Sequence, residues 1–176
     1  MIGCFTVNSI YHFGLFLFYR KNYTALYFAL INTVALVFNL LNLFHFEFEQ
    51  KIGSLTFILN SLFFLYFVKS FFPEEFLETL NRIYTAFALF FFLAVLFYPN
   101  GLYENAYMYF NKAIMLLMLF SIVYILQALI RALIRRREDS LPILTGMTVL
   151  LVFSLSRYFF KESFVRIPNP LGALFF

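Results

Sequence analysis

Long apolar runs alternate with short polar segments along almost the whole chain. Each run is close to the length of about 20 residues that an α-helix needs to cross a bilayer core roughly 30 Å thick. We therefore expect an all-α fold, a polytopic bundle of transmembrane helices. Six complete spans are predicted, at about residues 2–19, 23–44, 52–68, 83–97, 113–130 and 141–156.

A seventh apolar run begins at Leu171 and reaches the last residue given, Phe176. A helix of this length covers only about 9 Å, which is too short to cross the bilayer core. We therefore expect a truncated seventh helix. Residues 1–176 are expected to form a single transmembrane domain that is a fragment of a longer protein.

Two junctions between the runs predict where helices begin and end. The segment Phe71-Phe72-Pro73-Glu74-Glu75 is typical of a helix start, because proline suits the first helical turn and carboxylates favour the positive end of the helix dipole. One helix is therefore predicted over about residues 73–97, with Glu78 and Arg82 spaced as a surface ion pair. The segment Tyr98–Gly101 predicts a turn, since proline, asparagine and glycine together interrupt a helix.

Composition places the chain in the membrane class. It is 63% apolar and 12% charged, with a mean hydropathy of +0.85, whereas a soluble domain is about half apolar and a quarter charged. Its single cysteine excludes a disulfide scaffold within the chain. We interpret the net charge of +4 as a topology signal, so the expected partner is the lipid bilayer and not a nucleic acid.

The distribution of cationic residues predicts the orientation of the bundle. With the N-terminus outside, the inner connections carry eight cations and the outer ones carry five. The inner set is Arg20, Lys21, Lys69, Arg82, Arg131, Arg135, Arg136 and Arg137, and the outer set is Lys51, Lys112, Arg157, Lys161 and Arg166. Arg131 and Arg135–Arg137 form a basic cluster, which is the strongest single indication of this orientation. This cluster either reports topology alone or also binds anionic lipid or a cytoplasmic partner.

Polar residues inside the spans are the candidate ligand or switch positions, because the bilayer interior tolerates them only when they find partners. Asn32, Asn39 and Asn42 fall within about 80° of one another on the second span. Asn8 and His12 share a face of the first span. These side chains either form hydrogen bonds between helices, line a ligand pocket made by Asn8, His12 and Asn39, or relay protons. His12 is expected to be neutral and hydrogen-bonded, since no acidic residue lies within a predicted span.

The sequence offers little for catalysis or metal binding. Its one cysteine and two histidines, Cys4, His12 and His45, lack the spacing of a ligand pair, so no metal and no cofactor are expected. The carboxylate pairs Glu47 with Glu49 and Glu74 with Glu75 are interpreted as solvated faces. No nucleophile motif or phosphate-binding loop occurs. An enzyme is not indicated, and no catalytic residue is assigned.

Several segments resemble the bacterial seven-transmembrane receptors with diverse intracellular signalling modules. Asn8–Leu15 is similar to the Tyr-His first span of that family, Phe18–Asn22 to its cationic turn, and Ala25–Leu30 to its Leu-Tyr-Phe second span. The Phe-Pro junction at Phe71–Glu75 also resembles the family. The order and spacing of these segments carry the resemblance over essentially all 176 residues.

The resemblance implies a sensory receptor region in the bacterial inner membrane, crossing it several times. Known members bind carbohydrate or another small ligand through an extracellular domain, and they carry an output enzyme on the inside. The implied partners are therefore an extracellular ligand, bound by a domain outside this stretch, and a cytoplasmic signalling domain in cis; a homodimer also stays open. The family implies no catalytic residue in this region. Two other functions stay open: a small-solute transporter, and a membrane anchoring or assembly subunit.

Overall fold

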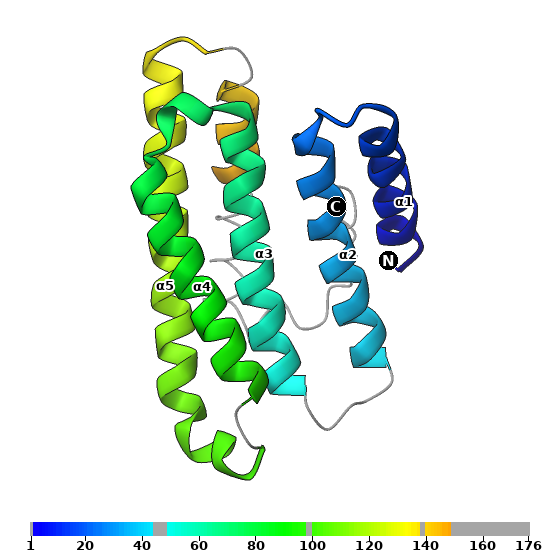
Figure 1. Ribbon diagram of the computed structural model, residues 1–176, viewed down its shortest axis with the longest axis vertical. Coiled ribbons are helices and arrows are strands. Elements are labelled where there is room, and N and C mark those ends of the chain that lie inside the picture. The colour runs from blue at the N-terminus through cyan, green and yellow to red at the C-terminus, as the bar shows by residue number, and fades with distance from the viewer. Residues whose placement is uncertain (1, 44–48, 98–99, 138–139, 149–176) are drawn as a thin grey trace, which may run out of the picture. The chain divides into compact units, whose positions relative to one another are not determined.

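The computed structural model of the chain describes residues 2–43, 49–97, 100–137 and 140–148. Every regular element in these ranges is helical, which confirms the all-α prediction (Figure 1). The chain divides into two compact units, Met1–Ile125 and Leu126–Phe176. The elements are α1 (Ile2–Phe18), α2 (Tyr23–Leu43), α3 (Glu49–Phe71), the short 3₁₀ helix η1 (Pro73–Glu75), α4 (Glu78–Phe97) and α5 (Asn100–Ile134).

Four of these helices are long and apolar enough to cross a membrane. Their candidate spans are Tyr23–Leu41, Lys51–Phe71, Glu78–Phe97 and Lys112–Ile134, and α1 is an apolar helix of 17 residues. The second to fifth predicted spans therefore coincide with helices. Residues 141–148 of the predicted sixth span are helical. The remainder of that span and the predicted seventh helix at 171–176 lie outside the described residues.

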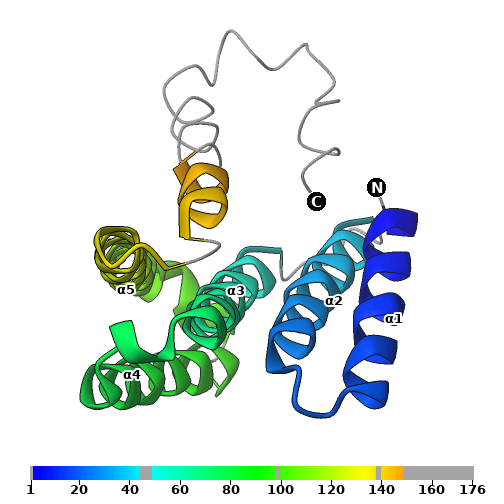
Figure 2. The ribbon, with the colours of Figure 1, turned by 90° about the horizontal axis from the view of Figure 1, so that it is seen from above.

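Helices α1 to α4 follow one another in space as they do in sequence. Figure 2 shows α2 between α1 and α3, with α4 against another side of α3. Ala25 and Ala29 on α2 and Ala88 on α4 are fully or almost fully buried. Small side chains at helix contacts let the backbones approach closely, which is how helices associate where lipid removes the hydrophobic driving force. This pattern is typical of a membrane bundle.

The turn between α1 and α2 is closed by its own hydrogen bonds. The backbone N–H of Asn22 donates to the carbonyl oxygen of Tyr19 at 2.7 Å. The side-chain oxygen of Asn22 then accepts the backbone N–H of Ala25 at 3.2 Å. An asparagine in this position satisfies one of the free N–H groups at a helix start. The polar residues between the first two apolar runs therefore form a tight connection.

The single helix predicted over 73–97 is wrong. Pro73–Glu75 form η1, Phe76 is extended with φ −102° and ψ 132°, and α4 begins at Glu78. Proline does occupy the first turn as predicted, but the chain leaves helical geometry after one turn. The physical cause is a tertiary hydrogen bond to Leu77, described below.

The charged residues of this junction also differ from prediction. Glu78 pairs with Lys69 of α3 at 2.8 Å and not with Arg82. Glu74 is exposed as expected, but Glu75 is only 3% exposed, so its assignment to a solvated face is wrong. Buried carboxyl groups are rare and costly. The junction is therefore packed into the protein around Glu75 and is not a surface loop.

The turn predicted at Tyr98–Gly101 is wrong in its second half, because α5 already begins at Asn100 and runs for 35 residues. Residues 100 and 101 are helical because asparagine and glycine are tolerated at a helix start, and the first half of the predicted turn, residues 98–99, lies outside the described residues. A helix of this length measures about 52 Å, more than the bilayer core. The apolar candidate span within it begins at Lys112, close to the prediction.

Candidate functional site

Helices α1 and α2 contact each other through His12 of one polar face that the sequence indicates and through two hydroxyl groups that it does not. The hydroxyl of Thr33 donates to the hydroxyl of Ser9 at 3.3 Å, and the His12 ring meets the Phe28 ring edge-on at 4.5 Å between centroids. The helices are antiparallel, so these contacts fix their register. His12 thus faces α2.

In the predicted asparagine stripe on α2, the side-chain amides of Asn32 and Asn39 form hydrogen bonds with backbone carbonyl groups of the same helix. The Nδ2 of Asn32 donates to the carbonyl of Phe28 at 2.8 Å, and the Nδ2 of Asn39 donates to the carbonyl of Ala35 at 2.7 Å. Asn32 is buried at 2% exposure. The side chain of Asn42 lies outside the described residues.

The register separates the three residues of the predicted ligand pocket. Because Ser9 lies opposite Thr33 and His12 opposite Phe28, Asn39 falls near the first residues of α1. At 1.5 Å per residue this level lies about 8 Å from Asn8 and about 14 Å from His12 along the helix. Asn39 is therefore not brought together with the other two. Asn8 and His12 remain one turn apart on α1.

His12 has an aromatic environment. Its ring also meets the Tyr11 ring edge-on at 5.1 Å, and its Nδ1 is buried without a hydrogen-bond partner among the described residues. A ring held between aromatic edges in this way suits a neutral imidazole.

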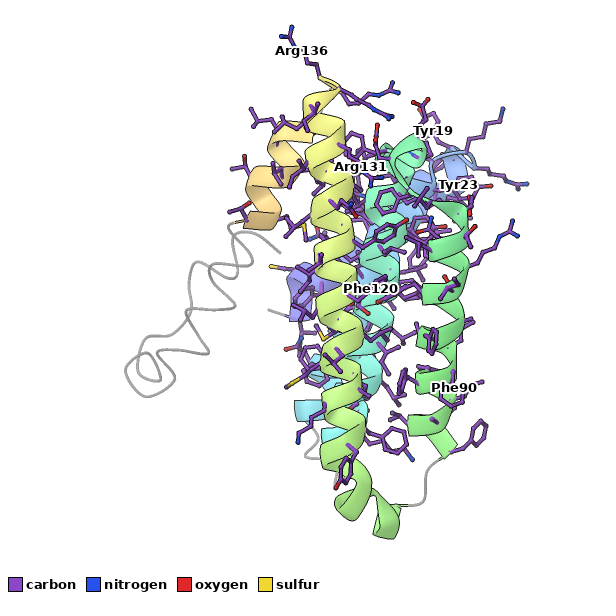
Figure 3. All side chains as sticks on the ribbon, turned by 90° about the vertical axis from the view of Figure 1, so that its left-hand side faces the viewer. Tyr19, Tyr23, Phe90, Phe120, Arg131 and Arg136 are labelled. Atoms are coloured by element: carbon purple, nitrogen blue, oxygen red, sulfur yellow. The ribbon has the colours of Figure 1, made fainter. Side chains whose placement is uncertain are left out.

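A second polar cluster lies where α3, α4 and α5 meet within the first unit. The Tyr84 hydroxyl on α4 lies 2.8 Å from the hydroxyl of Ser61 on α3. Tyr84 is 2% exposed. This one side chain connects three helices, because its hydroxyl contacts α3 and its ring contacts α5. Its ring stacks on Phe120 of α5 at 6.2 Å between centroids, and Figure 3 shows Phe120 about half-way along that helix.

Tyr66 makes the corresponding connection between α2, α3 and α4. Its ring stacks on Tyr27 of α2 at 5.5 Å, and its hydroxyl lies 2.9 Å from that of Thr85 on α4. The ammonium group of Lys69 lies 5.7 Å from the centre of the same ring, within range of a cation–π contact. Near it, the hydroxyls of Thr24 and Ser70 join α2 to α3 at 2.7 Å.

Tyr124 of α5 binds the backbone at the break between η1 and α4. Its hydroxyl accepts the N–H of Leu77 at 2.8 Å and donates to the carbonyl oxygen of Leu77 at 3.3 Å. The buried Phe76 ring packs edge-on against the Tyr124 ring at 5.3 Å. The N–H of Leu77, which a continuous helix would direct to residue 73, is therefore satisfied by a side chain from a distant helix. This contact explains why α4 does not begin at Pro73.

Asn81 lies one turn beyond Leu77 and is 1% exposed. Its backbone N–H donates to the Leu77 carbonyl at 3.0 Å. Neither its Nδ2 nor its Oδ1 has a hydrogen-bond partner among the described residues. A buried amide in this state costs free energy, because water would satisfy both groups.

Sequence reasoning did not bring together the residues of this second cluster, which we call the tyrosine cluster: Ser61, Tyr66, Asn81, Tyr84, Ser121 and Tyr124. A signal for part of it exists, because Asn81, Tyr84, Ala88 and Val95 are the buried residues of α4 and lie three, four and seven positions apart on one face. Tyrosine, however, also marks membrane interfaces, and composition alone cannot separate the two uses.

A model of the family described as 7TM diverse intracellular signalling matches residues 1–173. The chain belongs to this family. The match covers almost the whole chain and confirms the resemblance seen in the sequence. No curated protein and no solved structure matches the chain.

In this 7TM diverse intracellular signalling domain, the described residues contain no group of three or more histidine, cysteine, aspartate or glutamate side chains that could hold a metal ion. Cys4 is exposed. The chemistry of both polar clusters is that of hydroxyl, amide and aromatic groups. Such groups form and exchange hydrogen bonds, and they set how helices pack.

The basic cluster belongs to the second unit and is built on the end of α5. Arg137 N–H donates to the carbonyl of Ala132 at 3.0 Å and Arg136 N–H to that of Leu133 at 2.9 Å. This is the Schellman arrangement, in which the residue with positive φ is usually glycine. Here it is Arg136, with φ 53°, and its side chain extends beyond the end of the helix (Figure 3). Arg135–Arg137 are exposed, and Arg131 is half-buried.

Proposed function

We propose that this domain is the transmembrane region of a bacterial sensory receptor, and that it passes an extracellular signal to a cytoplasmic output module. The observation that carries the proposal is the family match over residues 1–173. Several helices long and apolar enough to cross a membrane support it, since they make the chain a multi-pass membrane protein. The inner membrane of a bacterium is the location proposed.

The packing of the first unit suits a relay. Helices α2, α3 and α4 are joined by single hydrogen bonds between hydroxyl groups, such as those of Tyr66 with Thr85 and Thr24 with Ser70. One such bond inside a membrane is worth about 0.6 kcal/mol. Contacts of this strength stabilise one arrangement of the helices but do not prevent the helices from adopting another. A signal that binds one arrangement a few kcal/mol more tightly than the other is enough to shift the equilibrium between them.

The receptor function predicts that Tyr66→Phe changes the output of the full-length protein. This substitution removes the hydrogen bond to Thr85 but keeps the ring stacked on Tyr27, so the fold should be retained. Loss of about 0.6 kcal/mol in one state changes the balance between two states about threefold. The measurement is output activity with and without signal, divided by protein abundance. Tyr109→Phe is the control, since Tyr109 is 69% exposed. An output that falls only in proportion to abundance would contradict the relay and favour an anchoring role.

We further propose six complete spans, the start of a seventh, and an N-terminus outside. The cation count supports the orientation, and the spans follow the apolar runs. In this arrangement the turn between α1 and α2 lies in the cytoplasm. Lys21 is exposed in that turn.

A labelling experiment tests the orientation. Cysteine is introduced as Lys21→Cys after Cys4→Ser has removed the chain's single cysteine. In spheroplasts with an intact inner membrane, a membrane-impermeant maleimide should label the cysteine at position 21 only after permeabilisation. Labelling without permeabilisation would reverse the proposed orientation. The Cys4→Ser protein alone serves as the unlabelled control.

A further inference from the structure

The C-terminal end of α5 carries a basic cluster that the receptor function does not use. Arg135–Arg137 are exposed, and Arg131 is half-buried, less than one turn before the candidate span ends at Ile134. Residues 131–139 contain these four arginines against two acidic residues, so the net charge of the segment is positive. A cationic group at the end of a membrane span lies at the level of the lipid headgroups, where anionic lipids attract it.

The backbone of Arg136 has a conformation that favours glycine. Its φ is 53°, and it closes the Schellman arrangement at the end of α5, where glycine is the usual residue because it has no Cβ. An arginine is therefore unfavourable for the helix end itself. The side chain is exposed and extends beyond the helix (Figure 3). Strain of this kind indicates that the guanidinium group serves a contact outside α5.

The surface of α5 beside the cluster offers polar and apolar groups in the order in which a phospholipid presents its own. Gln127 is exposed and lies one turn deeper in the span than Arg131, within about 40° of it around the helix. Ile130 and Ile134 lie on the adjoining strip and are 49% and 75% exposed. Guanidinium groups bind phosphate, an amide donates to the ester carbonyl groups below it, and apolar side chains contact acyl chains. A soluble anion would use only the first of these contacts.

We propose that this end of α5 binds the headgroup of an anionic phospholipid. Arg131 and Arg136 bind its phosphate, and Gln127 donates to an ester carbonyl oxygen. Arginine suits this ligand, because its planar set of N–H donors matches phosphate oxygens in pairs. The exposed isoleucines beside the arginines favour a lipid over an acidic protein segment, since they contact acyl chains. The site depends on the chain being a membrane protein and not on the receptor function.

The test is native mass spectrometry of the whole chain in neutral detergent, titrated with dioleoyl phosphatidylglycerol or dioleoyl phosphatidylcholine. The two lipids share their acyl chains and differ in headgroup charge, so the chain should bind phosphatidylglycerol more tightly. Arg131→Gln should weaken this binding about fivefold, the contribution of one cation near an anionic lipid surface. Lys112→Gln is the matched control, because it removes an exposed cation from the other end of the same apolar span. It should leave phosphatidylglycerol binding unchanged.

Arg136→Gly separates lipid binding from folding, because the two expected effects have opposite signs. Glycine relieves the positive φ, so the thermal midpoint in neutral detergent should rise by about 2–4 °C. The same substitution removes a guanidinium group, so phosphatidylglycerol binding should weaken about fivefold. A fall in both quantities would show that the arginine supports the fold, and would overturn the site.

Two other ligands of the basic cluster are distinguished by the same titration. Inorganic phosphate in excess should not displace phosphatidylglycerol, because it lacks the ester and acyl contacts. Displacement would assign the cluster to a soluble anion instead of a lipid. Equal binding of the two lipids, or equal losses for Lys112→Gln and Arg131→Gln, would also contradict the proposal. The cluster would then report topology alone or bind a cytoplasmic protein.

Discussion

Truncation of Tyr84 to alanine is expected to destabilise the bundle more than any other single substitution in the tyrosine cluster. Its side chain is among the largest that are fully buried, and it contacts helices α3 and α5 from α4. Removing a buried aromatic ring leaves a cavity and costs about 3–5 kcal/mol. The thermal midpoint in detergent, followed by gel filtration after heating, should fall by roughly 10 °C.

The neighbouring substitution Tyr84→Phe should have a much smaller effect. It removes the hydroxyl, but Ser61 and Ser121 keep hydrogen bonds to the carbonyl groups of Ile58 and Met118. No buried group is then left unsatisfied, so the cost is about 0.6 kcal/mol. Phe90→Ala on the same helix is the size-matched control, because Phe90 is 63% exposed (Figure 3). A fall as large for Phe90→Ala as for Tyr84→Ala would show that the two positions do not differ in burial.

Replacement of Asn81 by leucine is expected to stabilise the chain. Leucine has the same branching as asparagine but carries no group that needs a hydrogen bond. Each buried polar group without a partner costs about 1–3 kcal/mol, so the thermal midpoint should rise by several degrees, measured as for Tyr84. The effect is opposite in sign to that of most substitutions of a buried residue.

Asn32→Leu provides the contrast for this prediction. Both asparagines are almost completely buried, but the Nδ2 of Asn32 donates to Phe28. Asn32→Leu should therefore be neutral or destabilising. A lower midpoint for Asn81→Leu would show that the Asn81 amide is satisfied in the membrane. The smaller variant Asn81→Ala distinguishes this result from overpacking by leucine, since alanine adds no volume.

Helix positions followed closely from the sequence, because the hydrocarbon core dictates the length of any apolar run that crosses it. The predicted starts at residues 2 and 23 are those of α1 and α2, and the apolar span of α5 begins at Lys112, next to the predicted 113. The family followed from the order of short segments such as Asn8–Leu15 and Phe71–Glu75, and the match over residues 1–173 bears it out.

Only part of the candidate site could be predicted from the sequence. His12 was recognisable because a histidine inside an apolar run is rare, and its contact with Phe28 places it between α1 and α2. The predicted grouping with Asn39 depended on the register of α1 against α2, which a helical wheel of one span does not contain. Tyr66, Tyr84 and Tyr124 were passed over because a tyrosine at a membrane interface and one that connects three helices look alike in sequence.

The amino-acid sequence by itself determined that this protein is a bundle of apolar helices, where most of them lie, and the family to which it belongs. Those properties arise because every backbone polar group inside a membrane needs a hydrogen-bond partner, and each helical segment provides these partners by itself. The tertiary structure decided that α4 begins at Glu78 and not at Pro73, that Glu78 pairs with Lys69, and that Asn81 is buried without a partner. These properties depend on which residues of separate helices meet, and the hydroxyl of Tyr124 reaches Leu77 across 47 positions of the chain.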